Sequence, residues 1–175
     1  MTAKGGLAGR ATELRRSFDR SFADPPRAAV AVLEDLLTIR VAGDPYALCL
    51  AECAGLFADR KVTPLPTTVP ELLGLAGSRG ALVPVYDLGA LLGYPRDASR
   101  RWLVTTAGSA VVGLAFDEFE AHVRIDHDAV AEDDSPARRH ADRVAHLPDG
   151  ARRVLRVASI LDSIDGRAAA LRQGA

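Results

Sequence analysis

From Leu36 onward the chain is divided into short apolar runs, separated by glycine, proline and polar turn residues. Runs of four to seven residues are too short for ordinary helices and are typical of β-strands joined by turns. The sequence therefore predicts a mainly β fold, with strands at about residues 38–41, 46–50, 53–58, 72–76, 81–86, 102–106, 110–116, 119–125 and 151–157.

Two helices are predicted to follow strands. Asp87 has a side chain suited to cap a short helix over residues 88–92, and Gly93 is suited to end it. Ser159 is a similar capping residue before an apolar stretch at residues 160–171. We therefore expect both helices to begin directly after these capping residues.

The order of strand, cap, helix and stop occurs twice and indicates two small β units. We place these units at about residues 36–95 and 100–158, within one domain over residues 36–166. The polar segment at residues 126–150 is interpreted as a loop or a partly helical excursion. Residues 159–175 are assigned to a C-terminal helix and tail.

Residues 1–35 differ in composition from the strand-forming part and are assigned to an N-terminal extension. Leu14, Phe18 and Phe22 recur every fourth residue, which places them on one face of a short helix. Two successive prolines after Asp24 end that helix. The apolar stripe has two possible roles: it packs against the chain's own β units, or it docks in a partner's groove.

Composition narrows the class of protein. The 175 residues are 48% apolar, which suffices for a folded core. Lys and Arg number 22 against 23 Asp and Glu, so the chain lacks the basic excess on which nucleic-acid and anionic-membrane binders depend. The chain has no secretory signal and no apolar run near the ~18 residues of a membrane helix, so we expect a cytoplasmic protein.

Motifs for catalysis and metal binding are not found. Gly74, Gly77 and Gly80 are spaced three apart, which matches neither a dinucleotide fingerprint nor a phosphate loop. Cys49 and Cys53 have no second Cys or His pair at zinc spacing. Neighbouring carboxylates and dispersed histidines form no acid–base pair that the sequence identifies. We therefore expect a protein without enzymatic activity, metal or cofactor.

The segment over residues 65–88 carries the most specific motif of the chain, LPTTVPELLGLAGSRGALVPVYDL. It resembles the signature of the CheW-like domain, roughly P-x-x-P-x-x-x-x-G-x-x-N-L-R-G-x-x-x-P-V-x-D-L. The spacing from Gly74 to Leu88 matches without a gap. GDPYAL at residues 43–48 and VVGLAFD at residues 111–117 resemble flanking strands of the same family.

The resemblance implies a fold of two small five-stranded β-barrels packed together, with short helices at the N-terminus, after each barrel's closing strand and at the C-terminus. It also implies a non-enzymatic adaptor in a bacterial chemosensory array. Such adaptors couple the cytoplasmic tip of methyl-accepting receptors to the regulatory domain of a CheA-type histidine kinase, and other CheW-like domains are further possible partners.

The resemblance also nominates partner-binding residues, on the positions that match the family motif. These are Arg79, Gly80, Leu82, Pro84, Val85, Asp87 and Leu88. The chain departs from the family pattern at four positions, Gly55, Gly77, Ser78 and Gly89.

Two other functions stay open at this point. A small β-barrel that binds a ligand or nucleic acid is disfavoured by the near-neutral charge and by only nine scattered aromatic residues. A hydrolase would require folding to gather the carboxylates and histidines, for which the sequence gives no indication.

Overall fold

The computed structural model describes residues 32–95, 100–133 and 139–173. The chain divides into two compact units, Met1–Val32 and Leu33–Ala175, and every element below belongs to the second. The expected N-terminal helix with Leu14, Phe18 and Phe22 lies outside the described residues.

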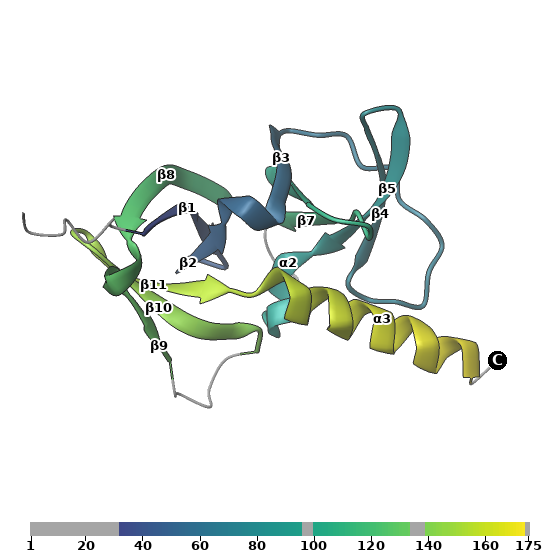
Figure 1. Ribbon diagram of the computed structural model, residues 1–175. Helices are drawn as coiled ribbons and strands as arrows, with labels where there is room; N and C mark the ends of the chain where they lie inside the picture. Colours follow the sequence, from purple (N-terminus) through teal and green to yellow (C-terminus); the bar gives the residue numbers. More distant parts are fainter. Residues whose placement is uncertain (1–31, 96–99, 134–138, 174–175) are drawn as a thin grey trace, which may run out of the picture. The chain divides into compact units, whose positions relative to one another are not determined.

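The first sheet has six strands in the order β8-β1-β2-β11-β10-β9 (Figure 1). Its edge strands β8 and β9 are consecutive in the chain and are separated only by the 3-10 turn His127–Ala129. A connection of three residues can bridge only a short distance, so the end of β8 must lie close to the start of β9. Because these are the two edge strands, the sheet must curl until its edges approach each other. The strands are β1 (Leu33–Val41), β2 (Asp44–Cys49), β8 (Glu118–Asp126), β9 (Val130–Glu132), β10 (Ala141–Leu147) and β11 (Gly150–Leu155).

The second sheet has five strands in the order β3-β6-β7-β5-β4. Its edges, β3 and β4, approach each other at a place that we call the seam, where residues just after β3 contact β4. Thr63 and Leu75 exchange two backbone hydrogen bonds there, at 2.8 and 2.9 Å. The strands are β3 (Cys53–Ala58), β4 (Leu72–Ser78), β5 (Ala81–Asp87), β6 (Trp102–Thr106) and β7 (Gly113–Phe116).

Helices follow the last strand of each predicted unit. Asp87 caps α2 (Leu88–Leu92) through its Oδ1 atom, which accepts from the Ala90 amide at 3.1 Å, and Gly93 ends the helix at φ 91°. The second helix, α3, spans Val157–Gln173 and therefore begins two residues before its predicted cap, Ser159. That prediction was wrong, because Ser159 lies inside the helix, where its hydroxyl contacts the His140 ring at 2.9 Å.

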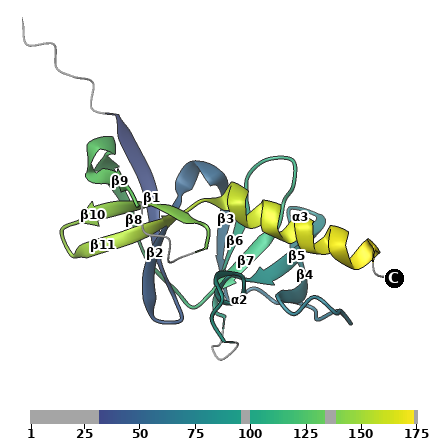
Figure 2. The ribbon, with the colours of Figure 1, turned by 90° about the horizontal axis from the view of Figure 1, so that it is seen from below.

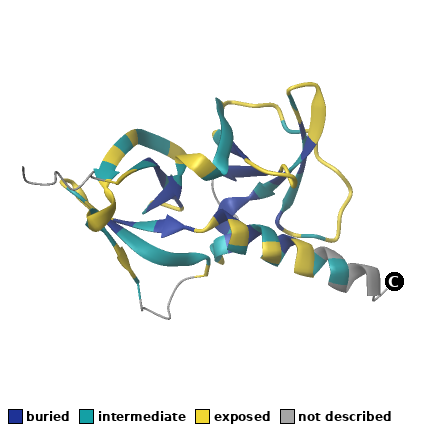
Figure 3. Ribbon diagram, in the orientation of Figure 1, coloured by how far each residue is buried: buried dark blue, intermediate teal, exposed yellow. Residues whose placement is uncertain are grey.

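A single core joins the two sheets. Figures 1 and 2 show α3 leaving the end of β11 and running beside the second sheet, and Figure 3 shows buried residues concentrated between the sheets. The cluster draws side chains from both sheets and both helices: Leu37, Ile39, Val41, Tyr46, Leu48, Leu88, Leu91, Val104, Val112, Leu114, Phe116, Leu155, Val157, Ile160 and Ile164. A short η1 turn, Leu50–Glu52, leads from the first sheet into β3.

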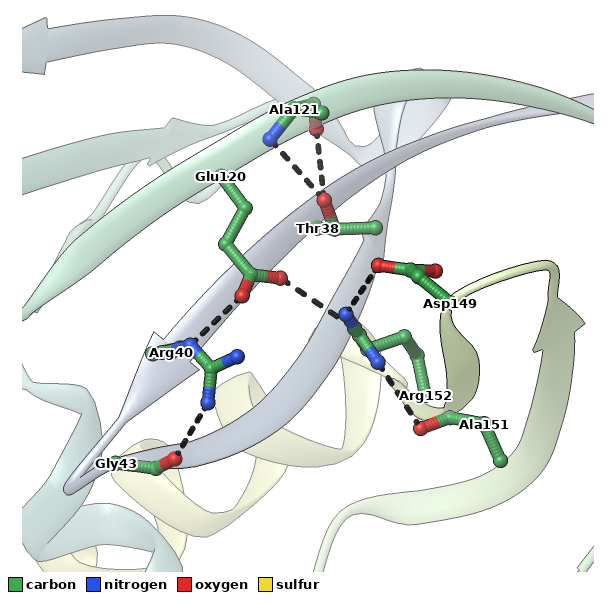
Figure 4. Close-up of polar contacts among 8 residues, drawn as sticks. All are labelled: Thr38, Arg40, Gly43, Glu120, Ala121, Asp149, Ala151 and Arg152. Atoms are coloured by element: carbon green, nitrogen blue, oxygen red, sulfur yellow. Dashed lines mark hydrogen bonds and ion pairs between the residues drawn. The ribbon is translucent and has the colours of Figure 1, made fainter.

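The inner face of the first sheet is apolar only in part. Leu36 packs there in a cluster of four buried residues, two of which are alanines. Toward one end of the sheet the inner face carries the Arg40 and Arg152 guanidinium groups in place of apolar side chains. Both contact the Glu120 carboxylate, at 2.7 and 3.4 Å (Figure 4). Glu120 is the extra residue of a β-bulge, and Thr38 fills the bulge by bonding the Ala121 backbone.

The structure confirms the mainly β fold of two packed units but corrects three details. The first sheet has six strands, where five were expected. The sheets do not follow the predicted halves at residues 36–95 and 100–158, because β3, β4 and β5 pair with β6 and β7, whereas β8 returns to β1. Residues 126–150 contain β9 and β10 in place of a loop or helical excursion. Their charged side chains had obscured the alternation of a half-exposed sheet.

Gly74 is required for the seam to close. Its φ of 146° is rarely adopted by other residues, and a Cβ atom there would lie 2.0 Å from the Thr63 carbonyl oxygen. Gly74→Ala is expected to lower the free energy of unfolding by about 2–4 kcal/mol, since backbone atoms must move apart. Urea denaturation measures this change.

A glycine in open space is the control. Gly166 lies in α3 with no atom within 4 Å of a built Cβ. Gly166→Ala is expected to raise stability by up to about 1 kcal/mol through helix propensity. Equal stability of the Gly74→Ala variant and the wild type would contradict the role of the close approach.

Candidate functional site

The motif shared with the CheW-like signature lies on the β4–β5 hairpin and on the start of α2. The hairpin turn consists of Arg79 and Gly80, both with positive φ, at 48° and 82°. Positive φ at both central residues is the geometry of the two-residue turn that suits the twist of paired strands. The turn and the two residues that follow it, Ala81 and Leu82, are exposed.

Arg79 has a partner within its own chain. Its guanidinium donates to the Ala54 carbonyl on β3 at 2.9 Å, so it spans the seam from the end of β4. Arg60 spans the seam in the other direction and donates to the Gly77 carbonyl on β4, with a distance of 3.0 Å from Nε. The same guanidinium lies over the Phe57 ring, 5.2 Å from its centre. Arginine side chains therefore supplement the single backbone bridge between β3 and β4.

A hollow follows the seam next to the hairpin. It has a volume of about 760 Å³, and its lining includes Arg60, Lys61, Leu75, Gly77 and Leu82. The Leu82 side chain is 74% exposed, more than any other large apolar residue described. An exposed leucine beside basic groups can contribute both apolar contact and charge to a binding surface.

Three of the seven nominated partner-binding residues are buried and cannot form a surface. Val85 and Leu88 have no exposed area, and Asp87 is 3% exposed. Val85 faces inward because alternate residues of β5 point to opposite faces, and Leu88 packs in the shared core. The nominated surface is thereby reduced to Arg79, Gly80 and Leu82, with Pro84 half-buried beside them.

Asp87 binds a buried arginine in addition to capping α2. Arg100 approaches the Asp87 carboxylate with two nitrogens, at 2.9 and 3.0 Å, and it contacts Asp117 at 2.7 Å. Asp117 also accepts from the Ala42 amide in the β1–β2 turn. The network joins the end of β5, in the second sheet, to a turn of the first sheet.

Gly89 makes room for this network. A Cβ atom on Gly89 would lie 2.9 Å from an Arg100 nitrogen and 3.2 Å from Asp87 Oδ1. The guanidinium comes from eleven residues further along the chain and occupies the space beside the glycine.

The cysteines are placed as structural residues. Both are free thiols, and Cys53 donates to the Cys49 carbonyl at 3.3 Å. Burial raises the pKa of the Cys53 thiol to about 12, which disfavours the reactive thiolate. Within the described residues, no cluster of His, Cys, Asp and Glu could hold a metal ion. No described helix is long and apolar enough to cross a membrane.

Sequence reasoning did not identify several residues of this region. The sequence did not indicate that Arg100 forms a buried ion pair, because an isolated arginine in a sequence cannot be distinguished from one exposed at the surface. Asp117 belongs to the neighbouring carboxylates for which the sequence identified no partner, and its carboxylate contacts the largely buried Arg100. Arg60 and Lys61 follow β3 without a motif, and only the approach of β4 brings them beside Leu82.

Comparisons with known proteins agree with this architecture. The family model of the CheW-like domain matches residues 35–165. Among the solved structures, the scaffolding protein TtCheW from Thermoanaerobacter tengcongensis matches with a TM-score of 0.63 and 18% sequence identity. That match covers 70% of this chain and 88% of the other, and at this identity it shows the fold. No curated protein matches the chain.

The buried network yields a prediction about stability. Asp87→Ala removes the cap of α2 and leaves the Arg100 charge without its bidentate partner, so the free energy of unfolding should fall by about 3–5 kcal/mol. Asp142→Ala is the matched control, because Asp142 pairs with Arg156 at the surface with 47% of its side chain exposed. The control substitution should lower the free energy of unfolding by less than about 1 kcal/mol. Similar losses in the two variants, measured by chemical denaturation, would contradict a special role for the buried network.

Proposed function

The chain belongs to the family of CheW-like domains, and from this we propose that it is a non-enzymatic adaptor of a bacterial chemosensory array. In this proposal it couples the cytoplasmic tip of methyl-accepting receptors to the regulatory domain of a CheA-type histidine kinase. The observation that carries the proposal is the extent of the family match, residues 35–165, which includes all the strands of both sheets except the first two residues of β1.

The geometry supports two different roles for residues of the motif, one in stabilising the fold and one in binding a partner. Asp87, Val85 and Leu88 stabilise the fold from inside, while the hairpin presents Leu82 to solvent. Arg79 lies at the hairpin turn with its guanidinium on the Ala54 carbonyl, which fixes its position before a partner arrives. A pre-positioned arginine and an exposed leucine lose little side-chain entropy on binding.

The proposed mechanism depends on a rigid connection between the two sheets. The two sheets share one core, and a buried ion network links them, so partners bound to separate surfaces would be held at a fixed spacing. A conformational change in the receptor then biases the kinase only through the different contacts that each state makes with the adaptor. We further propose that the protein acts in the cytoplasm, with other CheW-like domains as additional partners.

The Leu82 surface can be tested without disturbing the fold. Leu82→Asp should reduce capture of a histidine kinase or chemoreceptor from native lysate by about tenfold or more, as expected for a central apolar contact. Arg79→Glu should also reduce capture, and because it removes the hydrogen bond to the Ala54 carbonyl as well, its fold is checked by circular dichroism. Val111→Asp is the matched control, because Val111 is also partly exposed but lies in the β6–β7 connection. Captured proteins are identified by mass spectrometry.

Three outcomes separate the possibilities. Loss with Leu82→Asp but not with Val111→Asp supports an adaptor that uses the hairpin. Loss only after deletion of residues 1–24 would instead favour the N-terminal stripe of Leu14, Phe18 and Phe22 as the docking element. Recovery of neither protein class with the wild type would contradict the coupling role.

A further inference from the structure

Among the described residues, most basic side chains are paired with carboxylates, and three of those that are not lie together at the seam. Nine arginines within the described ranges form ion pairs with Asp or Glu: Arg40, Arg100, Arg101, Arg124, Arg143, Arg152, Arg153, Arg156 and Arg167. Arg60, Lys61 and Arg79 have no carboxylate partner among the described residues. All three are exposed.

These three charges surround an apolar spot. Arg60 and Lys61 line the hollow together with Leu82, and Arg79 lies in the turn that leads into the strand of Leu82. The acidic residue in the lining, Asp59, is already paired with Arg101 at 3.3 Å. The seam therefore holds three uncompensated positive charges, although the chain as a whole carries a net charge of -1.

Arg60 and Arg79 are held in place by contacts within the chain and can still bind an acceptor from a partner. Arg60 is held by the Phe57 ring and the Gly77 carbonyl, and Arg79 by the Ala54 carbonyl. A guanidinium has five N–H donors, so each retains donors for a second acceptor. Carboxylates are the natural complement, because a guanidinium can bind both of their oxygens. The carbonyl contacts also lower the entropic cost of forming such pairs.

We propose that the seam binds an acidic segment of a partner protein, with carboxylates on Arg60, Lys61 and Arg79 and an apolar side chain against Leu82. This inference rests on the proposed function in one respect, since Arg79 and Leu82 belong to both surfaces. It adds the chemistry of the partner: Asp or Glu residues flanking a residue such as leucine. It also extends the surface across the seam to the end of β3.

In the test, a synthetic peptide, Glu-Glu-Leu-Glu-Glu-Leu-Glu-Glu, is added to the isotope-labelled full chain, and binding is monitored by NMR. Amide shifts should change at the end of β3 and along the β4–β5 hairpin, and binding should weaken as salt rises. The counterpart with lysine in place of glutamate should not bind. Lys61→Glu should weaken binding by about five- to tenfold, the effect expected for reversing one exposed charge contact.

Variants separate seam binding from general charge effects. The seam contacts are made by Arg60, Arg79 and the Thr63–Leu75 bridge, and the side chains of Lys61 and Leu82 take no part in them, so Lys61→Glu and Leu82→Ser leave the closure of the seam intact. Arg139→Glu is the matched control, because Arg139 is exposed and also lacks a described carboxylate partner but lies before β10. Arg139→Glu should leave peptide affinity unchanged.

The outcomes are independent of the capture experiment. Absence of seam shifts at millimolar peptide, an equal effect of Arg139→Glu, or tighter binding of a single-stranded oligonucleotide would each overturn the inference. If kinase or receptor is captured but the peptide does not bind, the adaptor role stands and the acidic-segment site fails. If the peptide binds but neither protein is captured, the site stands and the coupling role fails.

Discussion

Neighbouring leucines in β1 serve two different cores. Leu36 packs inside the curled first sheet, whereas Leu37 packs in the core shared with the second sheet and α3. A strand buried on both faces fixes its register, because a slip by one residue would exchange every side chain between the two cores. The bulge at Glu120 and the Arg40–Glu120–Arg152 contacts then close the end of the first sheet where apolar side chains are lacking.

The family motif combines structural and surface residues in one short segment. Asp87 holds Arg100 and caps α2, so its place in the motif is explained by folding. The exposed residues on which the proposed functions depend lie at residues 79–82, in the hairpin turn and the start of β5, six to nine positions before α2. A motif that matches a family therefore does not distinguish residues that bind partners from residues that keep the binding surface in position.

Local features were predictable from the sequence, and non-local ones were not. The Asp87 cap and the nine predicted strands depend on residues within a few positions of one another, and the structure has a strand at each predicted place, although β9 and β10 were not predicted. The assignment of strands to sheets depends on pairing between distant segments, such as β1 with β8, for which one sequence gives no register. Ser159 is not the cap of α3 because the helix begins two residues earlier, at Val157, directly after the last strand of the first sheet.

The sequence by itself determined the mainly β class, the family and the two strands of the motif, because each depends on residue type at fixed local spacing. Only the tertiary structure decided that Val85 and Leu88 are buried, and that Arg60, Lys61 and Leu82 lie together at one seam. Exposure and charge compensation depend on which distant segments pack against a residue. Arg100 illustrates this, since its charge is neutralised by two carboxylates, each more than ten residues away in the chain.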